Sequence, residues 1–305
     1  MIRFIAKRVL WAIPVLWLVA TLTFVIMHIV PGGPFDKEKK LPPEIKANIE
    51  AKYHLDQPLH RQYLLYLNGL IRGDLGPSYK YVGRTVNDVI SDTFPVSMRL
   101  GFFALLIAFF FGLAAGILSS LAAHTIWDRA SMLLATAGIS TPNFVIGVLL
   151  VFVFSYRFKL FPPALWEGAR SMVLPAATLG LGPAAYIARL SRSSLLETNR
   201  QDYVRTARAK GLSEPSILFR HILKNAIAPV VTIMGPLTAA LVTGSFVVEY
   251  IFSVPGMGKF FITAVTNRDY PLIMGVTLIY AALIVAANLA VDLIYTLIDP
   301  RVKME

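Results

Sequence analysis

The sequence contains no cysteine and few charged residues. Without cysteine the chain has no disulfides, no thiolate metal ligands and no cysteine nucleophile. Charged residues make up only 15% of the 305 residues, whereas hydrophobic residues make up 56%, and the mean hydropathy is +0.62. This composition is too apolar for a soluble protein and predicts a polytopic membrane protein.

The motifs of several enzyme classes are absent as well. The stretch GMGKF at 256–260 is the closest approach to a phosphate-binding loop, but Ser253 replaces its first glycine and Phe260 replaces the magnesium-binding hydroxyl. None of the five histidines forms an HExxH zinc motif. Only His28 lies in an apolar run, so Ser140 lacks the base that an intramembrane serine protease needs. We therefore expect no enzyme activity, no metal, and no ATP or other cofactor bound by this chain.

Six uncharged runs of about 18 to 27 residues are long enough to cross a bilayer as helices. They are 9–30, 100–123, 130–156, 171–188, 226–248 and 270–291. The first run follows Arg3, Lys7 and Arg8, as in a signal peptide, but it lacks a clear small-residue cleavage site, which predicts a retained helix. We therefore expect an all-α membrane protein with six transmembrane helices, and six crossings place both termini on the same side.

The distribution of Lys and Arg predicts the side on which each loop lies. Eight of these residues lie in 189–225 and three in the first eight residues, whereas the short loops 157–170 and 251–269 contain three and two. Because Lys and Arg resist translocation, the termini and 189–225 are expected in the cytoplasm. The net charge of +11 is explained by these loops. Without a basic patch interleaved with aromatic residues, it indicates no nucleic-acid partner.

The segment 31–95 between the first two runs is long and nearly neutral, which predicts an extracytoplasmic subdomain. Helical patterns over 44–53 and 59–71 predict two short helices packed on the membrane face. An amphipathic pattern over 84–94 leads into the second span. The other predicted parts are an N-terminus with the first span at 1–30, a five-helix core at 96–298 with a polar loop at 193–225, and a cytoplasmic tail at 299–305.

Helix-breaking residues interrupt several of the apolar runs. Pro142 and Asn143 lie in the middle of the third run. Lipid cannot satisfy the carbonyls that proline frees, so such breaks should face other helices or a water-filled path. Two interpretations of Asn143 stay open, an interhelical hydrogen bond that holds the bundle together or a residue that lines a translocation path. Arg99 and Glu249 lie near the ends of apolar runs, where a charged side chain indicates a gate or an ion pair. The alternative for Arg99 is that its side chain extends to the membrane–water interface.

A polar stretch at 201–225 stands between two long apolar runs. It predicts a helix-turn-helix in which Asp202 caps a helix through Lys210, Gly211 ends that helix in the left-handed conformation, and Ser213 caps a second helix. Small side chains beside cations on the first helix favour a docking surface for a partner protein. The alternative is a basic loop that only orients the chain. The residues of the candidate docking helix are Asp202, Tyr203, Arg205, Thr206, Ala207, Arg208, Ala209, Lys210 and Gly211.

Several stretches together resemble a known family. They are KRVLWAIPVLWLV with VPGGPF, LPPEIKANIEAKYHLDQP, RGDLGPSYKY, FPVSMRLG, YVRTARAKGLSEPSILFRHILKNAIAPV, VVEYIFSVPGMGKFF with TNRDYP, and DPRVK. Over its whole length the chain resembles the B-type permease subunit of bacterial oligopeptide importers of the ATP-binding-cassette (ABC) class, within the dipeptide, oligopeptide and nickel permease family. Dipeptides, haem and nickel chelates stay open as alternative substrates. A stand-alone channel or secondary transporter is a more distant alternative, because the uncharged mid-spans offer no selectivity ring and no proton-coupling carboxylate.

The resemblance implies a complex of several subunits in the bacterial cytoplasmic (inner) membrane. The family's importers combine two permeases, of B and C type, with two cytoplasmic ATPases that use ATP with Mg, and with an extracytoplasmic, or periplasmic, peptide-binding protein. It further implies alternating access, with the ATPases docked on the first helix of 201–225. The segment 249–271 would then form an extracytoplasmic gate that turns at Pro255 and Gly256.

The resemblance is incomplete in the cytoplasmic signature of the family, EAAxxxG. Arg205 and Thr206 replace its acidic residue and first alanine, while Ala207 and Gly211 match. A salt bridge made by that glutamate elsewhere cannot be carried over to this chain. Arg205, Arg208 or Lys210 are instead expected to pair with acidic residues of an ATPase.

Overall fold

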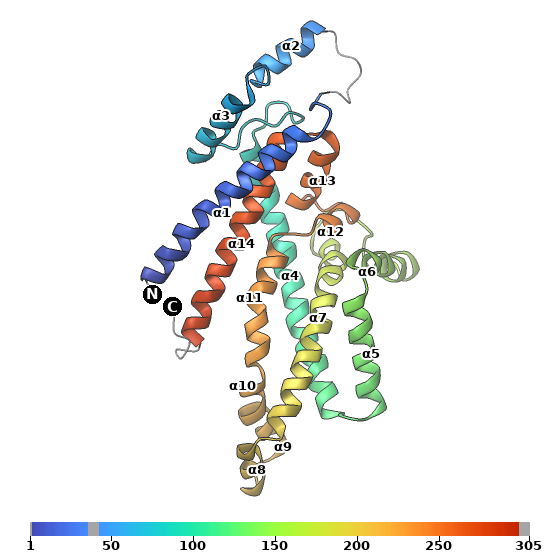
Figure 1. Cartoon of the computed structure of the whole chain (residues 1–305). Coiled ribbons are helices and arrows are strands. Elements are labelled where there is room, and N and C mark those ends of the chain that lie inside the picture. The colour runs from blue at the N-terminus through green and yellow to red at the C-terminus, as the bar shows by residue number, and fades with distance from the viewer. Residues whose placement is uncertain (1, 36–42, 299–305) are drawn as a thin grey trace. The chain divides into compact units, whose positions relative to one another are not determined.

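The computed structural model describes residues 2–35 and 43–298, so the predicted tail at 299–305 lies outside the described residues. The regular structure in these ranges is helical, apart from an isolated bridge between Pro77 and Thr85 (Figure 1). The helices, of which η1 and η2 are π-helical, are α1 (Ile2–Ile29), α2 (Pro43–Lys52), α3 (Leu59–Ile71), α4 (Val86–Leu121), α5 (Ile126–Ser140), α6 (Asn143–Leu150), η1 (Val151–Arg157), α7 (Ala169–Asn199), α8 (Asp202–Ala209), α9 (Glu214–Ser216), η2 (Ile217–Ile222), α10 (Leu223–Ala226), α11 (Ala228–Val242), α12 (Phe246–Ile251), α13 (Met257–Asn267) and α14 (Tyr270–Ile298).

The chain divides into two compact units. Among the described residues, unit 1 contains 2–35, 43–96 and 255–286, and unit 2 contains 97–254 and 287–298. The two short helices predicted between the first two spans are present in unit 1 as α2 and α3, and the amphipathic stretch predicted before the second span is the beginning of α4.

Four of the described helices are long and apolar enough to cross a membrane, namely α1, α4, α7 and α14. Two bent pairs meet the same test only when the members of each pair are taken together. Ile126–Ser140 meets Asn143–Arg157 at 112°, and Glu214–Ala226 meets Ala228–Val242 at 49°. The chain is therefore an all-α membrane protein, as predicted, with four spans, or up to six if each bent pair is one span.

The predicted third run, 130–156, is not one straight helix. α5 ends at Ser140 and α6 begins at Asn143, while Thr141 and Pro142 between them are extended, with ψ of 125° and 140° (Figure 1). Proline has no N–H to continue the helical hydrogen bonds and disfavours the helical conformation of the residue before it. The sequence thus located the break but not its 112° angle.

The predicted fifth run, 226–248, also ends early. α11 stops at Val242 and a separate helix, α12, begins at Phe246. Gly244 between them has φ +89°, which only glycine adopts readily, and a Cβ at this position would lie 2.5 Å from a carboxylate oxygen of Glu249. The glycine therefore both turns the chain and leaves room for a buried carboxylate.

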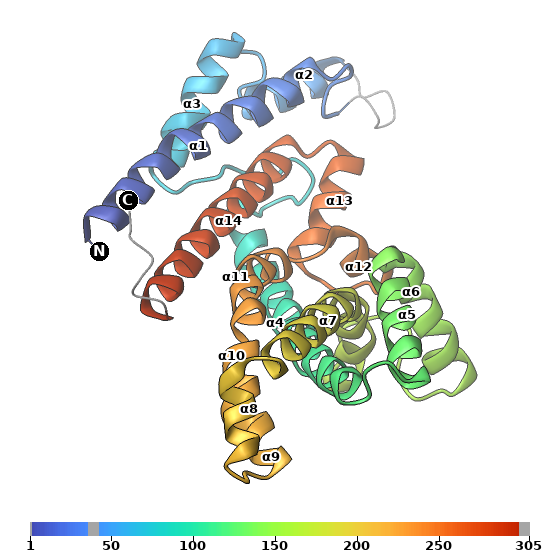
Figure 2. The same ribbon diagram turned by 60° about the horizontal axis from the view of Figure 1, so that its bottom comes forward.

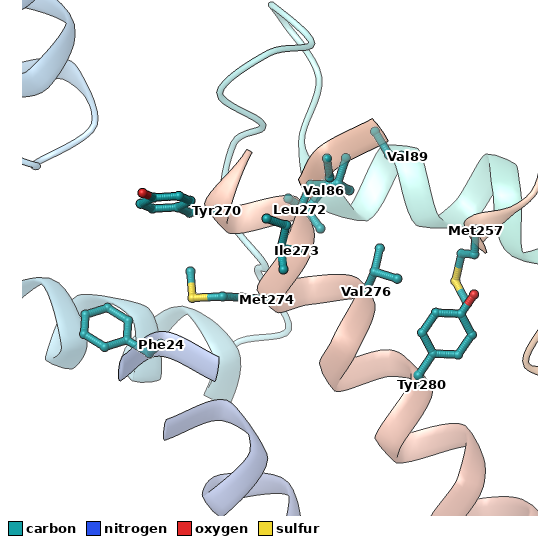
Figure 3. Packing of buried hydrophobic residues seen from close by; sticks show 11 residues of the cluster. Phe24, Val86, Val89, Met257, Tyr270, Leu272, Ile273, Met274, Val276 and Tyr280 are labelled. Carbon is teal, nitrogen blue, oxygen red and sulfur yellow. The ribbon is translucent and has the colours of Figure 1, made fainter. Parts of the chain in front are cut away.

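Unit 1 has its own hydrophobic core, which joins the beginnings of α4 and α14 to α13 and α1. Figure 3 shows these side chains gathered around the first turns of α14. Burying a side chain of this size contributes roughly 1.5–3 kcal/mol. The core residues are Phe24, Val86, Val89, Met257, Ala264, Tyr270, Leu272, Ile273, Met274, Val276 and Tyr280.

A buried carboxylate and the residues on either side of it connect three loops of unit 1. Asp269, fully buried just before α14, accepts hydrogen bonds from the Ser78 hydroxyl and from the N–H of Tyr79, the latter at 3.1 Å. The side chains on either side of Asp269 in the sequence donate to the carbonyls of Gly33, at 3.2 Å, and Gly32, at 2.9 Å. The stretches VPGGPF, RGDLGPSYKY and TNRDYP, far apart in sequence, therefore converge, and this gives them a structural role.

In unit 2, α4 and α7 approach so closely that only small residues fit between them. A Cβ added to Gly112 would lie 2.6 Å from the carbonyl oxygen of Ala184, and one added to Gly116 would lie 2.8 Å from that of Ala188. Gly180 of α7 is equally crowded against the backbone of α4. Small residues at every fourth position let membrane helices pack backbone to backbone. α4 and α7 therefore form one closely packed pair.

Candidate functional site

The polar stretch at 201–225 folds as the predicted helix-turn-helix, with α8 and α9 at the end of α7 (Figure 1, Figure 2). Gly211 has φ +79° and turns the chain after α8, and Ser213 is the N-cap residue of α9, both as predicted. One detail was wrong, because Gln201 is the N-cap residue of α8 and Asp202 lies in its first turn. There the carboxylate still stabilises the positive end of the helix dipole.

Two residues of α8 face inward. Val204 is 0% exposed and Ala207 is 5% exposed, and they pack against Leu195 of α7 and against Ile217 and Ile222 of η2. The expectation that Ala207 belongs to an open docking surface was therefore wrong. Residues three positions apart share one face of a helix, so this small residue lets α8 lie against its own chain.

Arg208 has its partners within the chain. Its Nε and Nη2 donate to the carboxylate of Glu214 at 2.8 and 3.2 Å, and Nη2 also donates to Asn199 at 2.7 Å. These bonds connect α8 to α9 and to the end of α7, and the bond to Glu214 raises the pKa of Arg208. Arg205 lies 3.6 Å from Asp202, and both side chains are at least 72% exposed, so water screens this contact.

The surface left on α8 for a partner is smaller than the sequence suggested. We define the outward face of α8 as Arg205, Thr206, Ala209 and Lys210, all of which are exposed. Tyr203 is partly engaged, since its hydroxyl accepts a hydrogen bond from Asn225 at 2.7 Å. The outward face has two cations, and the exposed Asp202 beside Arg205 leaves this side of α8 with a net positive charge, so it suits an acidic partner surface.

The break between α5 and α6 meets prolines of α7 and α11 at one pocket of unit 2, with a volume of about 470 Å³. Asn143 lies in its wall with Pro183 of α7 and Pro236 of α11, and a Cβ on Gly182 would lie 3.7 Å from the Asn143 side-chain oxygen. The bend at Pro142 therefore turns an amide side chain into a pocket that has no charged lining residue and whose other polar side chains are those of Thr141 and Tyr186. We call this the break pocket, and its other lining residues are Gly138, Ile139, Thr141, Tyr186, Ile233 and Leu237.

The remaining gate candidates do not line the break pocket. Arg99 is exposed on α4, and Glu249 of α12 is fully buried. Pro255 and Gly256 precede α13, with Gly256 as its N-cap residue, and the turn of the chain lies just before them, at Phe252 and Ser253. Of the six predicted path or gate residues, Asn143 alone lines this pocket in the described structure, and Pro142 precedes it at the bend.

Sequence reasoning missed a buried ion pair in unit 2. Asp128, at the start of α5, is 2% exposed and accepts hydrogen bonds from Nε and Nη2 of Arg192 at 2.6 and 2.7 Å. It also accepts from the Ser119 hydroxyl at 2.6 Å and from the N–H of His124 at 2.9 Å. The sequence contained one indication of this site, because Arg192 lies one helical turn after the small residues through which α7 packs on α4. Its partner, 64 residues earlier, was not apparent from the sequence.

Comparison with known proteins adds an independent finding. Residues 108–304 match the family described as "Binding-protein-dependent transport system inner membrane component", and residues 1–101 match its N-terminal counterpart. The chain is 48% identical to the dipeptide transport system permease protein DppB of Bacillus subtilis, over 100% of this chain and 99% of that protein. It is 44% identical to the oligopeptide transport system permease protein OppB of Salmonella typhimurium, over 99% of this chain and 100% of that protein.

A solved structure has a similar fold. A chain of the MetNI methionine ABC transporter in an inward-facing conformation superimposes with a TM-score of 0.59 at 17% sequence identity. The similarity covers 69% of this chain and 96% of that chain. At this low identity it supports the fold alone.

Proposed function

Because the chain belongs to the family of binding-protein-dependent transport system inner membrane components, we propose that it is a permease subunit of an ABC importer for oligopeptides. The observation that carries this proposal is similarity to peptide permeases over the full length of the chain. The stretch LPPEIKANIEAKYHL favours oligopeptides. The 48% identity to a dipeptide permease favours dipeptides as the second candidate.

In this proposal the chain works only as part of a complex in the bacterial inner membrane. A second permease of C type completes the path, an extracytoplasmic binding protein delivers the peptide, and two cytoplasmic ATPases bind ATP with Mg. The lack of a phosphate-binding loop in this chain supports that division. The excess of Lys and Arg in 189–225 supports a cytoplasmic location for α8 and for both termini, with α2 and α3 on the other side.

The outward face of α8 is the proposed contact with an ATPase. Arg205 and Lys210 would meet acidic side chains there, because both are exposed, Arg205 on α8 and Lys210 at its C-cap. Val204 and Ala207 would hold α8 on the end of α7, so that a displacement of α8 by the ATPase also displaces α7 and η2. Such a two-state element is what coupling between distant sites requires.

The break pocket is the proposed part of the translocation path in this subunit. A peptide backbone is polar, so its path must offer hydrogen-bonding groups without strongly binding charges. Asn143 is exposed in the pocket wall among residues without charge, which fits that need. The peptide would pass between this chain and the second permease by alternating access.

The test of this function compares peptide transport by the complete complex with transport by this chain alone. The complete complex and this chain alone are reconstituted in separate vesicles, and flux of labelled peptides of two to five residues is measured. We expect flux only with the complete complex, and competition among the peptide lengths identifies the preferred substrate. Peptide flux through the chain alone would instead indicate a channel or secondary transporter, and would refute the proposal.

A further inference from the structure

We infer that Asp128 and Arg192 are positioning residues that transmit movement of α8 to α5, and through α5 to the break pocket. The inference rests on the proposed function, because it concerns how ATPase movement reaches the path. It identifies a specific mechanical link that is separate from the docking helix and from the pocket itself.

The first step is the connection from α8 to α7. α7 ends at Asn199 and α8 begins at Asp202, so only two residues separate them. Leu195 of α7 is buried in the same cluster as Val204 of α8, and Asn199 accepts a hydrogen bond from Arg208 at 2.7 Å. A displacement of α8 therefore moves the end of α7 that carries Arg192.

The second step is the connection from α7 to α5. Only Asp128 and Ala135 are buried among the fifteen residues of α5. α5 also packs along α7, where a Cβ on Gly138 would lie 3.3 Å from the Cβ of Ala185, while its first turn is held by four hydrogen bonds to the Asp128 carboxylate. Two of these bonds come from Arg192, and the others come from Ser119 and His124. The start of α5 is thus attached both to α7 and to the end of α4.

The third step runs along α5 to the break pocket. From Asp128 to Ser140 the helix extends about 18 Å, at 1.5 Å per residue. Gly138 and Ile139 of its last turn line the pocket, and Thr141 and Asn143 follow at the bend. A movement imposed at Asp128 therefore reaches the pocket through a single helix.

The chemistry of the pair suits this role better than a role in stability. A guanidinium that donates two parallel hydrogen bonds to one carboxylate fixes orientation as well as distance. Burying two charges carries a desolvation penalty, so an apolar contact of the same size would serve stability equally well. Fixed orientation is what a link between two moving helices requires.

The test uses the complete importer in vesicles and measures peptide uptake and ATP hydrolysis together. Asp128→Asn removes the charge with little change of shape, and Arg192→Lys keeps the charge but loses the two-bond geometry. For both variants we expect ATP hydrolysis near the wild-type rate, and uptake per ATP lowered at least about 5-fold, the low end of usual coupling between sites. The matched control is Asp92→Asn, which breaks an ion pair with Arg84 in which the Asp92 side chain is 67% exposed.

Three outcomes would overturn the inference. Wild-type uptake per ATP in both variants would exclude the link. An equal loss of uptake per ATP in Asp92→Asn would show a general effect of the lost charge. Failure of both variants to assemble would mean that the pair only holds the fold. If the unmodified complex itself shows no ATP-driven uptake, the proposed function fails instead, so the two failures are distinguishable.

A distance measurement tests rigidity directly. The chain lacks cysteine, so Ile126→Cys on α5, 71% exposed, and Thr206→Cys on α8, exposed, can carry spin labels in a complex whose partners lack accessible cysteine. We expect the same narrow distance distribution with and without ATP, and a broadened one when Arg192→Lys is added. Distributions that respond to ATP identically with and without Arg192→Lys would contradict the link.

Discussion

At the scale of single residues, burial separates the side chains of α8 that build the fold from those that are available to a partner. Ala207 and Thr206 are adjacent in sequence, yet Ala207 is 5% exposed in the cluster with Leu195 and Ile217, whereas Thr206 lies on the outward face. From the sequence both are small residues of one basic helix. A bulky replacement of Ala207 would therefore test packing and not docking.

Ala207→Leu should destabilise the chain and Thr206→Leu should not. Extra carbons in a packed cluster cost about 1–3 kcal/mol, because neighbours must leave their preferred rotamers. Leu at the exposed position 206 has a helix propensity at least as good as that of Thr, so we expect little change. The measurement is the thermal unfolding midpoint of each variant in detergent. Equal midpoints for the two variants would mean that Ala207 is not packed against α7 and η2.

At the scale of elements, the sequence predicted the helices whose signals are local. The helical pattern over 59–71 and the glycine at 211 gave the correct helix, α3, and the correct turn, because each depends on neighbouring residues. Pro142 marked the break between α5 and α6 for the same reason. The bond between Asp128 and Arg192 was missed, since it depends on how α5 and α7 pack.

Charge reversal on the outward face of α8 should weaken the contact with the ATPases. We expect Arg205→Glu combined with Lys210→Glu to lower ATPase co-purification about 10-fold or more, because like charges replace complementary ones across the proposed interface. Lys224→Glu is the matched control, since it is exposed on α10 and lies outside α8.

This experiment also has a clear negative result. Full co-purification with both reversed residues, at low and at physiological salt, would mean that α8 does not dock through these cations. A loss of equal size in the Lys224→Glu control would indicate a general effect of the net charge.

At the scale of the whole molecule, apolar run lengths predicted the membrane class but not the shape of every span. The all-α membrane fold could be predicted from the sequence, because hydrophobic composition and the length of the apolar runs do not depend on tertiary packing. The predicted run 130–156 is a bent pair, at 112°, because Pro142 interrupts its helix, and a second bend, of 49°, falls at Ile227, near the beginning of the predicted run 226–248. The meeting of Asn143, Pro183 and Pro236 in one pocket likewise depended on tertiary packing, although Pro142, Pro183 and Pro236 are visible in the sequence as helix-breaking residues.

The central claim is that ATP hydrolysis by partner subunits drives peptide uptake through this chain. The most direct measurement is the initial rate of labelled oligopeptide uptake by vesicles that contain the complete importer, with ATP on the ATPase side. The account predicts uptake that requires both hydrolysable ATP and the binding protein, and that stops when the ATPases are inactivated. Uptake that continues at the same rate without ATP, driven by an ion gradient, would contradict it.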